Sequence, residues 1–224
     1  MITRCDDMSP RTKKQNEFIR EQRKQEILHA AVHVYVAKGY SATTLSDVAD
    51  QAGLAHGLVY YYFKNKKMLF RELYENMMDQ SLHYTTVYFE QDSPVLEQFK
   101  NYAMLICERV IKDPQTQRFY MRISLDLHHL YEPGEMSPFE WMKSFIKPMA
   151  QAIDKGIGHG VIRQGDVNLM AMQYWGAISQ GMSYLDQLLQ DLAAQGLKET
   201  EINRVMGEKF QQIAESAISL FKPD

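Results

Sequence analysis

Apolar residues recur at helical spacing along most of the chain, and no segment alternates with the two-residue period of a strand. From Arg20 to Lys38 one face carries Ile27, Ala31, Val34 and Tyr35, and Gly39 closes the helix. A long helix is predicted from Asn65 to about Tyr88. With 224 residues, the chain is long enough for a small domain followed by a larger helical body.

Further helix starts follow from capping residues placed before proline. They are Ser93-Pro94, Asp113-Pro114 and Ser137-Pro138, with Glu140 completing a capping box after Ser137. Pro148 should kink the third of these helices, which ends in the glycines Gly156, Gly158 and Gly160. Asp166 can cap a helix to about Gln195, and Thr200 or Glu201 begins a last helix to Phe221. The pattern predicts an all-α fold of about nine helices, without internal repeats.

Two short helices around a glycine turn are predicted at residues 43–62. Thr44 and Asp47 have the spacing of a capping box, and Gly53 supplies the left-handed residue of the turn. The residues expected on the buried face of the first helix are Leu45, Val48, Ala49 and Ala52, and Val59 and Phe63 turn inward from the second. Such a helix-turn-helix commonly places its second helix in the DNA major groove.

The run A-G-L-A-x-G-L-V-Y-x-Y-F-K-N-K-K-x-L from Ala52 to Leu69 resembles the DNA-binding domain of the TetR/AcrR (tetracycline-repressor) family of bacterial transcriptional regulators. The resemblance implies a three-helix DNA-binding domain at residues 20–81 and a ligand-binding and dimerisation domain at residues 82–224. It also implies a homodimeric repressor that a small ligand releases from operator DNA. The family often has Ser or Thr where Ala55 stands, so the second helix lacks a capping side chain here.

The resemblance assigns the DNA surface to the helix starts and to the outer face of the second helix. Thr44 and Ser46 can serve either as ordinary caps or as phosphate ligands, and in isolation the pattern favours the cap. At Gly57 the missing side chain would let the backbone approach DNA. Successive tyrosines point about 100° apart, so they cannot all be core; the family match favours Tyr60 and Tyr62 over Tyr61. The full set of predicted DNA contacts is Thr44, Ser46, Ala55, His56, Gly57, Leu58, Tyr60, Tyr61, Tyr62 and Lys66.

Charge divides unevenly along the chain. Residues 1–67 contain 11 basic and 7 acidic residues, a net +4, whereas the remainder contains 14 and 21, a net −7. A basic N-terminal part favours approach of that end to phosphate. The stretch from Arg11 to Lys24 is either a basic DNA-binding arm or a solvated tail.

The last two predicted helices each carry an apolar stripe. The resemblance implies that they form a four-helix bundle between two copies of the chain, although such stripes more often fill a core within one chain. The predicted dimer residues are Tyr174, Ala177, Ile178, Gly181, Leu185, Met206, Phe210, Ile213 and Ala217.

The middle of the chain is rich in methionine and aromatic residues, which either fill the core or line an adaptable apolar pocket. In the family this region holds an inducer, so a small apolar or aromatic ligand is expected. The predicted ligand contacts are Tyr84, Tyr88, Phe99, Tyr102, Met121, Leu125, His128, Trp141, Phe145, Met149 and Trp175.

One grouping suggests different chemistry. Asp126, His128, His129 and Glu132 could present metal ligands from one helix, which would make the chain a metal-dependent enzyme. No nucleotide-binding loop, catalytic triad or metalloprotease motif accompanies them, so neither an enzyme nor a cofactor is expected. A DNA-binding architectural protein without a ligand is the other alternative.

Composition bears on the compartment. The two cysteines, Cys5 and Cys107, make no disulfide framework, and the chain has neither an apolar run long enough to span a bilayer nor an apolar signal core. The sequence therefore predicts a cytoplasmic protein without a membrane partner.

Overall fold

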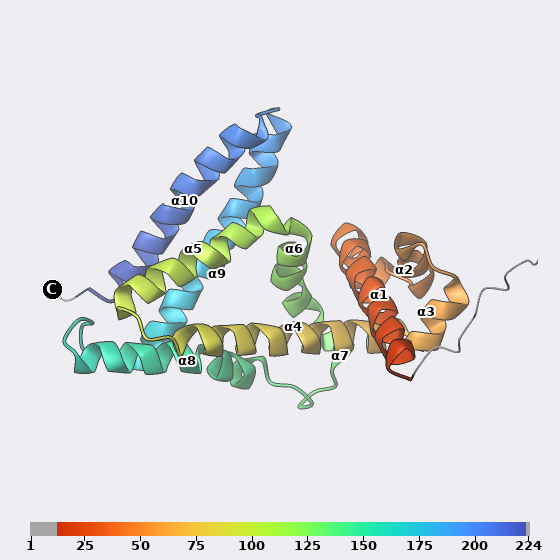
Figure 1. Ribbon diagram of the computed structural model, residues 1–224, viewed down its shortest axis with the longest axis horizontal. Coiled ribbons are helices and arrows are strands. Elements are labelled where there is room, and N and C mark those ends of the chain that lie inside the picture. Colours follow the sequence, from red (N-terminus) through yellow and green to blue (C-terminus); the bar gives the residue numbers. More distant parts are fainter. Residues whose placement is uncertain (1–12, 223–224) are drawn as a thin grey trace, which may run out of the picture. The chain divides into compact units, whose positions relative to one another are not determined.

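The computed structural model describes residues 13–222, which form two compact units dividing between Phe70 and Arg71. Within the described residues there are ten α-helices, one short 3-10 turn and no strand (Figure 1). The all-α prediction is confirmed. The predicted nine helices are all present, and the tenth is a single four-residue turn too short to produce a periodic pattern. The predicted domain boundary after residue 81 stays a prediction.

The first unit contains α1 (Lys13–Ala42), α2 (Leu45–Ala52), α3 (His56–Tyr62) and the start of α4 (Lys66–Phe89). Gly39 interrupts α1 with a φ of 74°, a left-handed backbone that favours glycine. The predicted end of the helix at Gly39 is therefore confirmed. The helix begins at Lys13 rather than at Arg20, and its first turns are exposed; Arg11 and Cys5 lie outside the described residues.

Packing inside the first unit centres on one face of α1. Ile27 and Ala31 are fully buried, and the rings of Tyr35 and Tyr40 each lie 5.6 Å from the ring of Phe70. From α2 and α3 the core receives Leu45, Val48, Ala49 and Val59, while Ala52 is only partly buried. Short helices that are marginal in isolation are stabilised by this shared apolar core.

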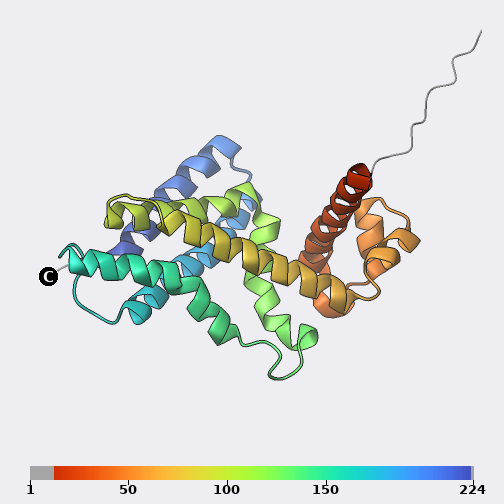
Figure 2. The same ribbon diagram turned by 60° about the horizontal axis from the view of Figure 1, so that its bottom comes forward.

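The second unit contains the rest of α4 and the remaining elements. These are α5 (Val95–Lys112), α6 (Pro114–Ile123), η1 (Ser124–Asp126), α7 (Leu127–Leu130), α8 (Pro138–Gly158), α9 (Val167–Ala194) and α10 (Glu199–Ser219). Helix α10 packs against α5 and α9, and α8 packs against α9. The C-terminal half of α4 lies alongside α8 in both views (Figures 1 and 2). Helices α4, α5, α6, α8 and α9 thus surround the interior of this unit.

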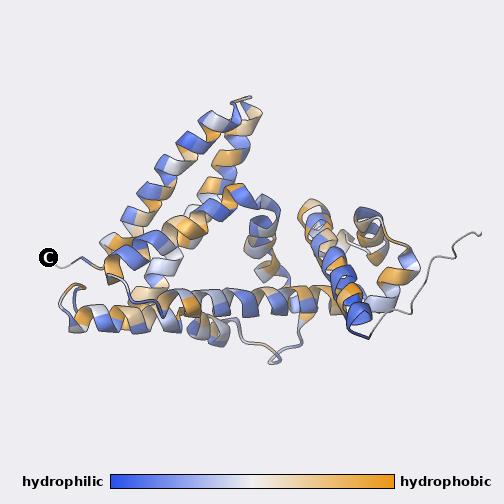
Figure 3. Cartoon of the chain, viewed as in Figure 1, coloured by the Kyte–Doolittle hydropathy of each residue, from blue (hydrophilic) through white to orange (hydrophobic). Residues whose placement is uncertain are grey.

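Aromatic rings dominate the core of the second unit. Phe99 is fully buried, with ring centroids 4.8 Å from those of Phe89, Tyr174 and Phe221. The hydroxyl of Tyr174 donates to the carbonyl of Phe99 at 2.6 Å. Hydrophobic and hydrophilic residues interchange along α10, as in a helix with one buried face (Figure 3).

The predicted helix starts have mixed outcomes. Asp113 and Asp166 accept hydrogen bonds from backbone N–H groups in the first turns of α6 and α9, as predicted. Ser137 caps α8, but the Glu140 carboxylate pairs with Lys143 instead of completing the capping box. The Ser93 prediction is wrong, because α5 begins at Val95 without a side-chain cap.

Pro148 lies inside α8, which is helical from Pro138 to Gly158, and the kink predicted at this proline stays a prediction. In residues 13–222, no helix has the length and apolar content that a bilayer crossing requires.

Candidate functional site

Helix α2 starts at the capping box that the sequence predicts, and Gly53 ends it before the turn to α3. The Thr44 hydroxyl accepts from the Asp47 N–H at 3.1 Å, and the Asp47 carboxylate accepts from the Thr44 N–H at 2.9 Å. Hydrogen bonds from Lys38 and Thr44 lower the pKa of Asp47 to about 2. Gly53 adopts a φ of 65° and its N–H caps the end of α2. These contacts fix where α3 starts.

The outer face of α3 is open. Ala55 begins the helix without a side-chain cap, as predicted, and a Cβ added to Gly57 would meet nothing within 4 Å. Tyr60 is 48% exposed and Tyr61 is 71% exposed, so Tyr61 is the more accessible of the two. The His56 ring lies 2.7 Å from the Asp50 carboxylate. This face combines aromatic rings, an imidazole and bare backbone, which suits contact with base edges and phosphates.

Lys66 occupies a position that sequence reasoning did not foresee. Its ammonium donates to the carbonyls of Tyr40 at 2.9 Å, Ser41 at 2.9 Å and Thr43 at 3.2 Å, and lies 4.7 Å from the centre of the Tyr40 ring. A lysine has three N–H donors, and all three are used here. Lys66 therefore ties the start of α4 to the chain between α1 and α2; its predicted phosphate contact stays a prediction.

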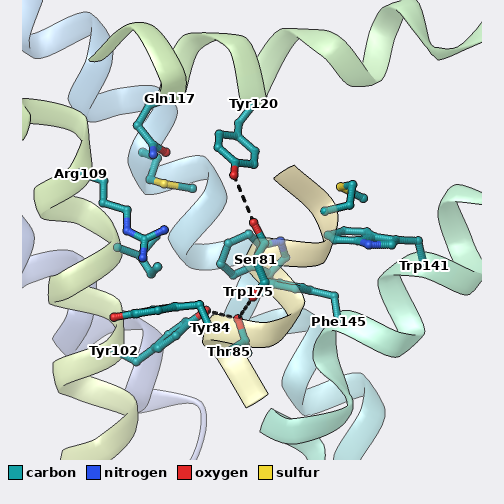
Figure 4. A pocket seen from close by; sticks show the side chains of 13 residues that line it. Ser81, Tyr84, Thr85, Tyr102, Arg109, Gln117, Tyr120, Trp141, Phe145 and Trp175 are labelled. Carbon is teal, nitrogen blue, oxygen red and sulfur yellow. Dashed lines mark hydrogen bonds between the residues drawn. The ribbon is translucent and has the colours of Figure 1, made fainter. Parts of the chain in front are cut away.

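The second unit contains a partly open cavity of about 90 Å³ among helices α4, α5, α6, α8 and α9 (Figure 4). Trp141 and Phe145 of α8 stack with ring centroids 5.0 Å apart, and the Trp175 ring lies 4.6 Å from Phe145. The full lining is Met78, Ser81, Tyr84, Thr85, Tyr102, Ile106, Arg109, Gln117, Tyr120, Trp141, Phe145, Trp175 and Met182. One side of the cavity is thus an aromatic wall.

Polar groups of α4, α5 and α6 gather away from that aromatic wall. The Thr85 and Tyr102 hydroxyls are 2.7 Å apart, and the Ser81 and Tyr120 hydroxyls are 3.3 Å apart. Burial raises the pKa of both tyrosines, opposed by these hydrogen bonds and by the charge of Arg109. Both phenols are therefore neutral at ordinary pH.

Five of the eleven predicted ligand residues line the cavity: Tyr84, Tyr102, Trp141, Phe145 and Trp175. Phe99 and Met149 lie in the core, and Tyr88 packs against it with its hydroxyl on the Gln98 carbonyl. The Met121 sulfur accepts from Ser183 at 3.5 Å. Leu125, 76% exposed, and His128, also exposed, do not line the cavity, because they lie on the short turns after α6.

Comparison with known proteins identifies the N-terminal part. Residues 27–73, which include the whole helix-turn-helix, match the family described as bacterial regulatory proteins, tetR family. This DNA-binding part of the chain belongs to the TetR family. Similarity extends further in individual relatives. The fatty acid metabolism regulator protein of Bacillus subtilis is 26% identical over 156 residues, covering 69% of this chain and 79% of the relative.

Another relative, an uncharacterised helix-turn-helix transcriptional regulator of Bacillus subtilis, is 37% identical, but the match covers only 34% of this chain and 35% of the relative. Among solved structures, the Bacillus subtilis regulator FadR in complex with stearoyl-CoA has a TM-score of 0.65 at 21% identity, covering 88% of this chain and 98% of FadR. A TetR-family regulator of Pectobacterium atrosepticum has a TM-score of 0.59 at 21% identity, covering 96% and 100%. At these identities the structures show a shared fold.

Most of the predicted dimer residues are buried inside one chain. Six are core residues in contact with the other helices of the second unit: Tyr174, Ile178, Leu185, Met206, Phe210 and Ala217. Their assignment to an interface between chains is corrected, because a core side chain has no surface left for a second copy. Ala177, Gly181 and Ile213 are partly exposed, and a Cβ on Gly181 would lie 2.8 Å from Ile213, so this glycine lets α9 approach α10.

The metal-site alternative is not assembled in this structure. Within residues 13–222, no three His, Cys, Asp or Glu side chains are placed to hold a metal ion. His128 and His129 contact one another with ring centroids 3.9 Å apart, and the His129 ring lies 4.0 Å from the Asp126 carboxylate. Asp126 ends η1, His128 and His129 lie in α7, and Glu132 follows α7, so the four do not share one helix face.

Sequence reasoning missed the polar half of the cavity. The missed residues are Met78, Ser81, Thr85, Ile106, Arg109, Gln117, Tyr120 and Met182. Arg109 and Gln117 look like surface positions in the sequence. A signal was available, since Arg109 lies three positions after the buried Ile106 and Gln117 three positions before Tyr120, so each pair shares a helical face.

Proposed function

We propose that the protein is a homodimeric transcriptional repressor that leaves its operator when a small apolar or aromatic ligand enters the cavity of the second unit. The observation that carries this proposal is an aromatic cavity in the same chain as a helix-turn-helix. Cavities with a few convergent polar groups are the usual form of small-molecule sites.

Helix α4 is the proposed connection between ligand and DNA. Its first turn carries Lys66, which holds three carbonyls beside the helix-turn-helix, and further along it carries Met78, Ser81, Tyr84 and Thr85, which line the cavity. A ligand that displaces the later turns of a continuous helix also acts on its first turn. Ligand binding shifts the equilibrium only by its differential affinity for the two conformations, and about 1.4 kcal/mol lowers operator affinity tenfold.

The DNA surface is proposed to be α3 with the first turn of α2. His56 and Leu58 are assigned to base edges, and Tyr60, Tyr61 and Tyr62 to bases or phosphates. His56, Tyr60 and Tyr61 are exposed, and Leu58 and Tyr62 are partly exposed. Thr44, Ser46 and the free N–H groups at the helix starts suit phosphate. The absence of a cap at Ala55 leaves the tip of α3 to be ordered by DNA.

Cavity size bears on the ligand. A cavity of roughly 150 Å³ admits one benzene ring, so about 90 Å³ fits a single ring only after small side-chain shifts. The relatives of this chain include a fatty acid metabolism regulator, and one similar solved structure holds stearoyl-CoA. Both favour an acyl ligand. A stearoyl chain is several times larger than the present cavity. We therefore favour a compact ligand.

Dimerisation is proposed through the partly exposed side of α9 and α10. A groove of about 260 Å³ there is lined by Ala177, Tyr184, Lys209, Gln212, Ile213 and Ser216. Tyr184 is 53% exposed, and a large exposed aromatic ring beside small residues is typical of association surfaces. Two-fold symmetry would present two copies of α3 to a palindromic site.

The experiment combines DNA selection with a dimer variant. Duplexes selected from a random pool should contain two half-sites about 34–36 Å apart, or a multiple of that spacing. Ala177→Asp should place an unpaired charge in the interface, giving monomers by light scattering and weak operator binding, while Gln187→Asp on the exposed side of α9 should remain dimeric. Wild-type monomers with full operator affinity would contradict the proposal.

A further inference from the structure

The cavity has a cation without a carboxylate partner. Arg109 of α5 is the only charged residue of its lining, and its guanidinium lies 4.5 Å from the centre of the Tyr84 ring. Within residues 13–222 no Asp or Glu lies within ion-pair distance of Arg109, whereas Arg118, nine residues further along the chain, is paired with Asp186 at 2.8 Å. A partly buried guanidinium that is held by a ring alone has unused N–H donors.

A second polar group beside the cavity is also unpartnered. Gln117 of α6 is 7% exposed, and its side-chain amide makes no hydrogen bond within the described residues. No fully enclosed polar side-chain atom of residues 13–222 lacks a partner, so the Gln117 amide opens onto the cavity rather than into dry core. Burying an amide without a hydrogen bond is costly, and a bound ligand would remove that cost.

These two groups lie on the same side of the cavity. In Figure 4, Arg109 and Gln117 are on one side, while Trp141 and Phe145 are on the other. The hydroxyls between them are already paired with one another, as Thr85 with Tyr102 and Ser81 with Tyr120. Among the lining donors that make no hydrogen bond within residues 13–222, the Tyr84 hydroxyl and the two indole N–H groups have one N–H or O–H each, whereas the Arg109 guanidinium and the Gln117 amide have several, and Arg109 alone among them is charged.

We propose that the ligand of this cavity is a small aromatic carboxylate, whose carboxylate binds Arg109 and Gln117 and whose ring packs against Trp141, Phe145 and Trp175. The proposal rests on the proposed function and deepens it by assigning charge and size to the ligand. A guanidinium fork matches the two oxygens of a carboxylate, and the Gln117 amide supplies a further N–H donor. An aromatic ring opposite the guanidinium can pack against the aromatic wall, and the small volume of the cavity excludes long acyl chains.

The test compares a charged ligand with its neutral isostere. Phenylacetate and phenylacetamide have similar shapes, and binding of each is measured through the fluorescence of Trp141 and Trp175, the two tryptophans of the chain, both of which line the cavity. Phenylacetate should bind at least tenfold more tightly than phenylacetamide. Equal affinity for the two compounds in the wild-type protein, or tighter binding of the amide, would overturn the proposal.

Two cavity variants and one remote control sharpen the result. Arg109→Gln should weaken phenylacetate at least tenfold and phenylacetamide less than threefold. Gln117→Glu should abolish the preference for the acid, because the new carboxylate would pair with Arg109 or repel the ligand. Arg204→Gln, on exposed α10, should change neither affinity. Circular dichroism establishes that each variant is folded, and a folded Arg109→Gln protein that keeps the full preference would overturn the assignment.

Because ligand binding is measured without DNA, its result tests the assigned ligand class independently of ligand-controlled release from the operator. Acid-selective binding that leaves operator affinity unchanged would contradict ligand-controlled release while supporting the assigned ligand class. Operator release by neutral compounds, without preference for the acid, would support ligand control and contradict the assigned charge.

Discussion

The two units of the chain are stabilised by contacts of different kinds. In the DNA-binding unit, polar contacts fix the short helices: the capping box of Thr44 at the start of α2, the left-handed Gly53 at its end, and the three carbonyls that accept from Lys66. In the ligand unit, aromatic rings from helices distant in sequence meet, as Phe99 does with Tyr174 and Phe221. A surface that must match DNA is held by directional polar contacts, whereas a core built from large rings leaves space for a cavity.

The largest expected effect tests the aromatic core. Phe99→Ala should destabilise the second unit by about 3–5 kcal/mol, because a fully buried ring is replaced by a void. Phe139→Ala is the matched control, since Phe139 is 58% exposed, and it should change stability by less than about 0.5 kcal/mol. Chemical denaturation measures both. Similar small losses for the two variants would show that Phe99 contributes to a binding surface rather than to the core.

The next effect tests the polar contacts of the DNA-binding unit. Lys66→Met keeps the aliphatic stem but removes the ammonium from three carbonyls, and should destabilise this unit by roughly 1–3 kcal/mol. Lys64→Met, at an exposed position, is the control. Thermal unfolding measures the loss of stability, and hydrogen exchange of the backbone amides in residues 40–45 shows where it occurs.

Operator binding of the same variant addresses the phosphate contact. If Lys66 also binds phosphate, Lys66→Met should reduce the slope of log affinity against log salt by about 1. An unchanged slope with lower stability would leave Lys66 as a structural residue only, and unchanged stability would contradict the role that its three hydrogen bonds indicate.

The smallest effect compares the two helix starts of the helix-turn-helix. Thr44→Ala removes a formed cap and should cost about 1 kcal/mol, whereas Ala55→Ser supplies a missing cap to α3 and should stabilise by up to about 1 kcal/mol. Thermal melts of the two variants and of the double variant measure these changes. Destabilisation by Ala55→Ser would mean that the open tip of α3 is not limited by capping.

The sequence predicts the DNA-binding unit well because its determinants are local. The capping box of Thr44 and Asp47 and the turn at Gly53 depend on residues within a few positions of one another, so spacing alone reveals them. The hydrogen bonds of Lys66 could not be predicted from spacing, because its partners, the carbonyls of residues 40, 41 and 43, are more than twenty positions away.

The ligand unit was predicted less completely for the same physical reason. Apolar periodicity identifies α9 and α10, but it does not distinguish Tyr174, which is buried in one chain, from Ala177, which is partly exposed. Likewise, composition identified the aromatic wall with Trp141 and Phe145 but not Arg109, because only the packing of five helices brings that cation to the cavity. Tertiary contacts decide between core, cavity and surface.

Ligand-controlled release requires that the cavity and the DNA surface are energetically coupled. The most direct measurement is the dissociation constant of a selected operator with and without saturating phenylacetate, together with the dissociation constant of phenylacetate with and without saturating operator. Linkage requires both constants to change by the same factor, and we expect the binding of operator and of phenylacetate each to become at least tenfold weaker. Saturable binding of phenylacetate in the cavity with both constants unchanged would contradict it.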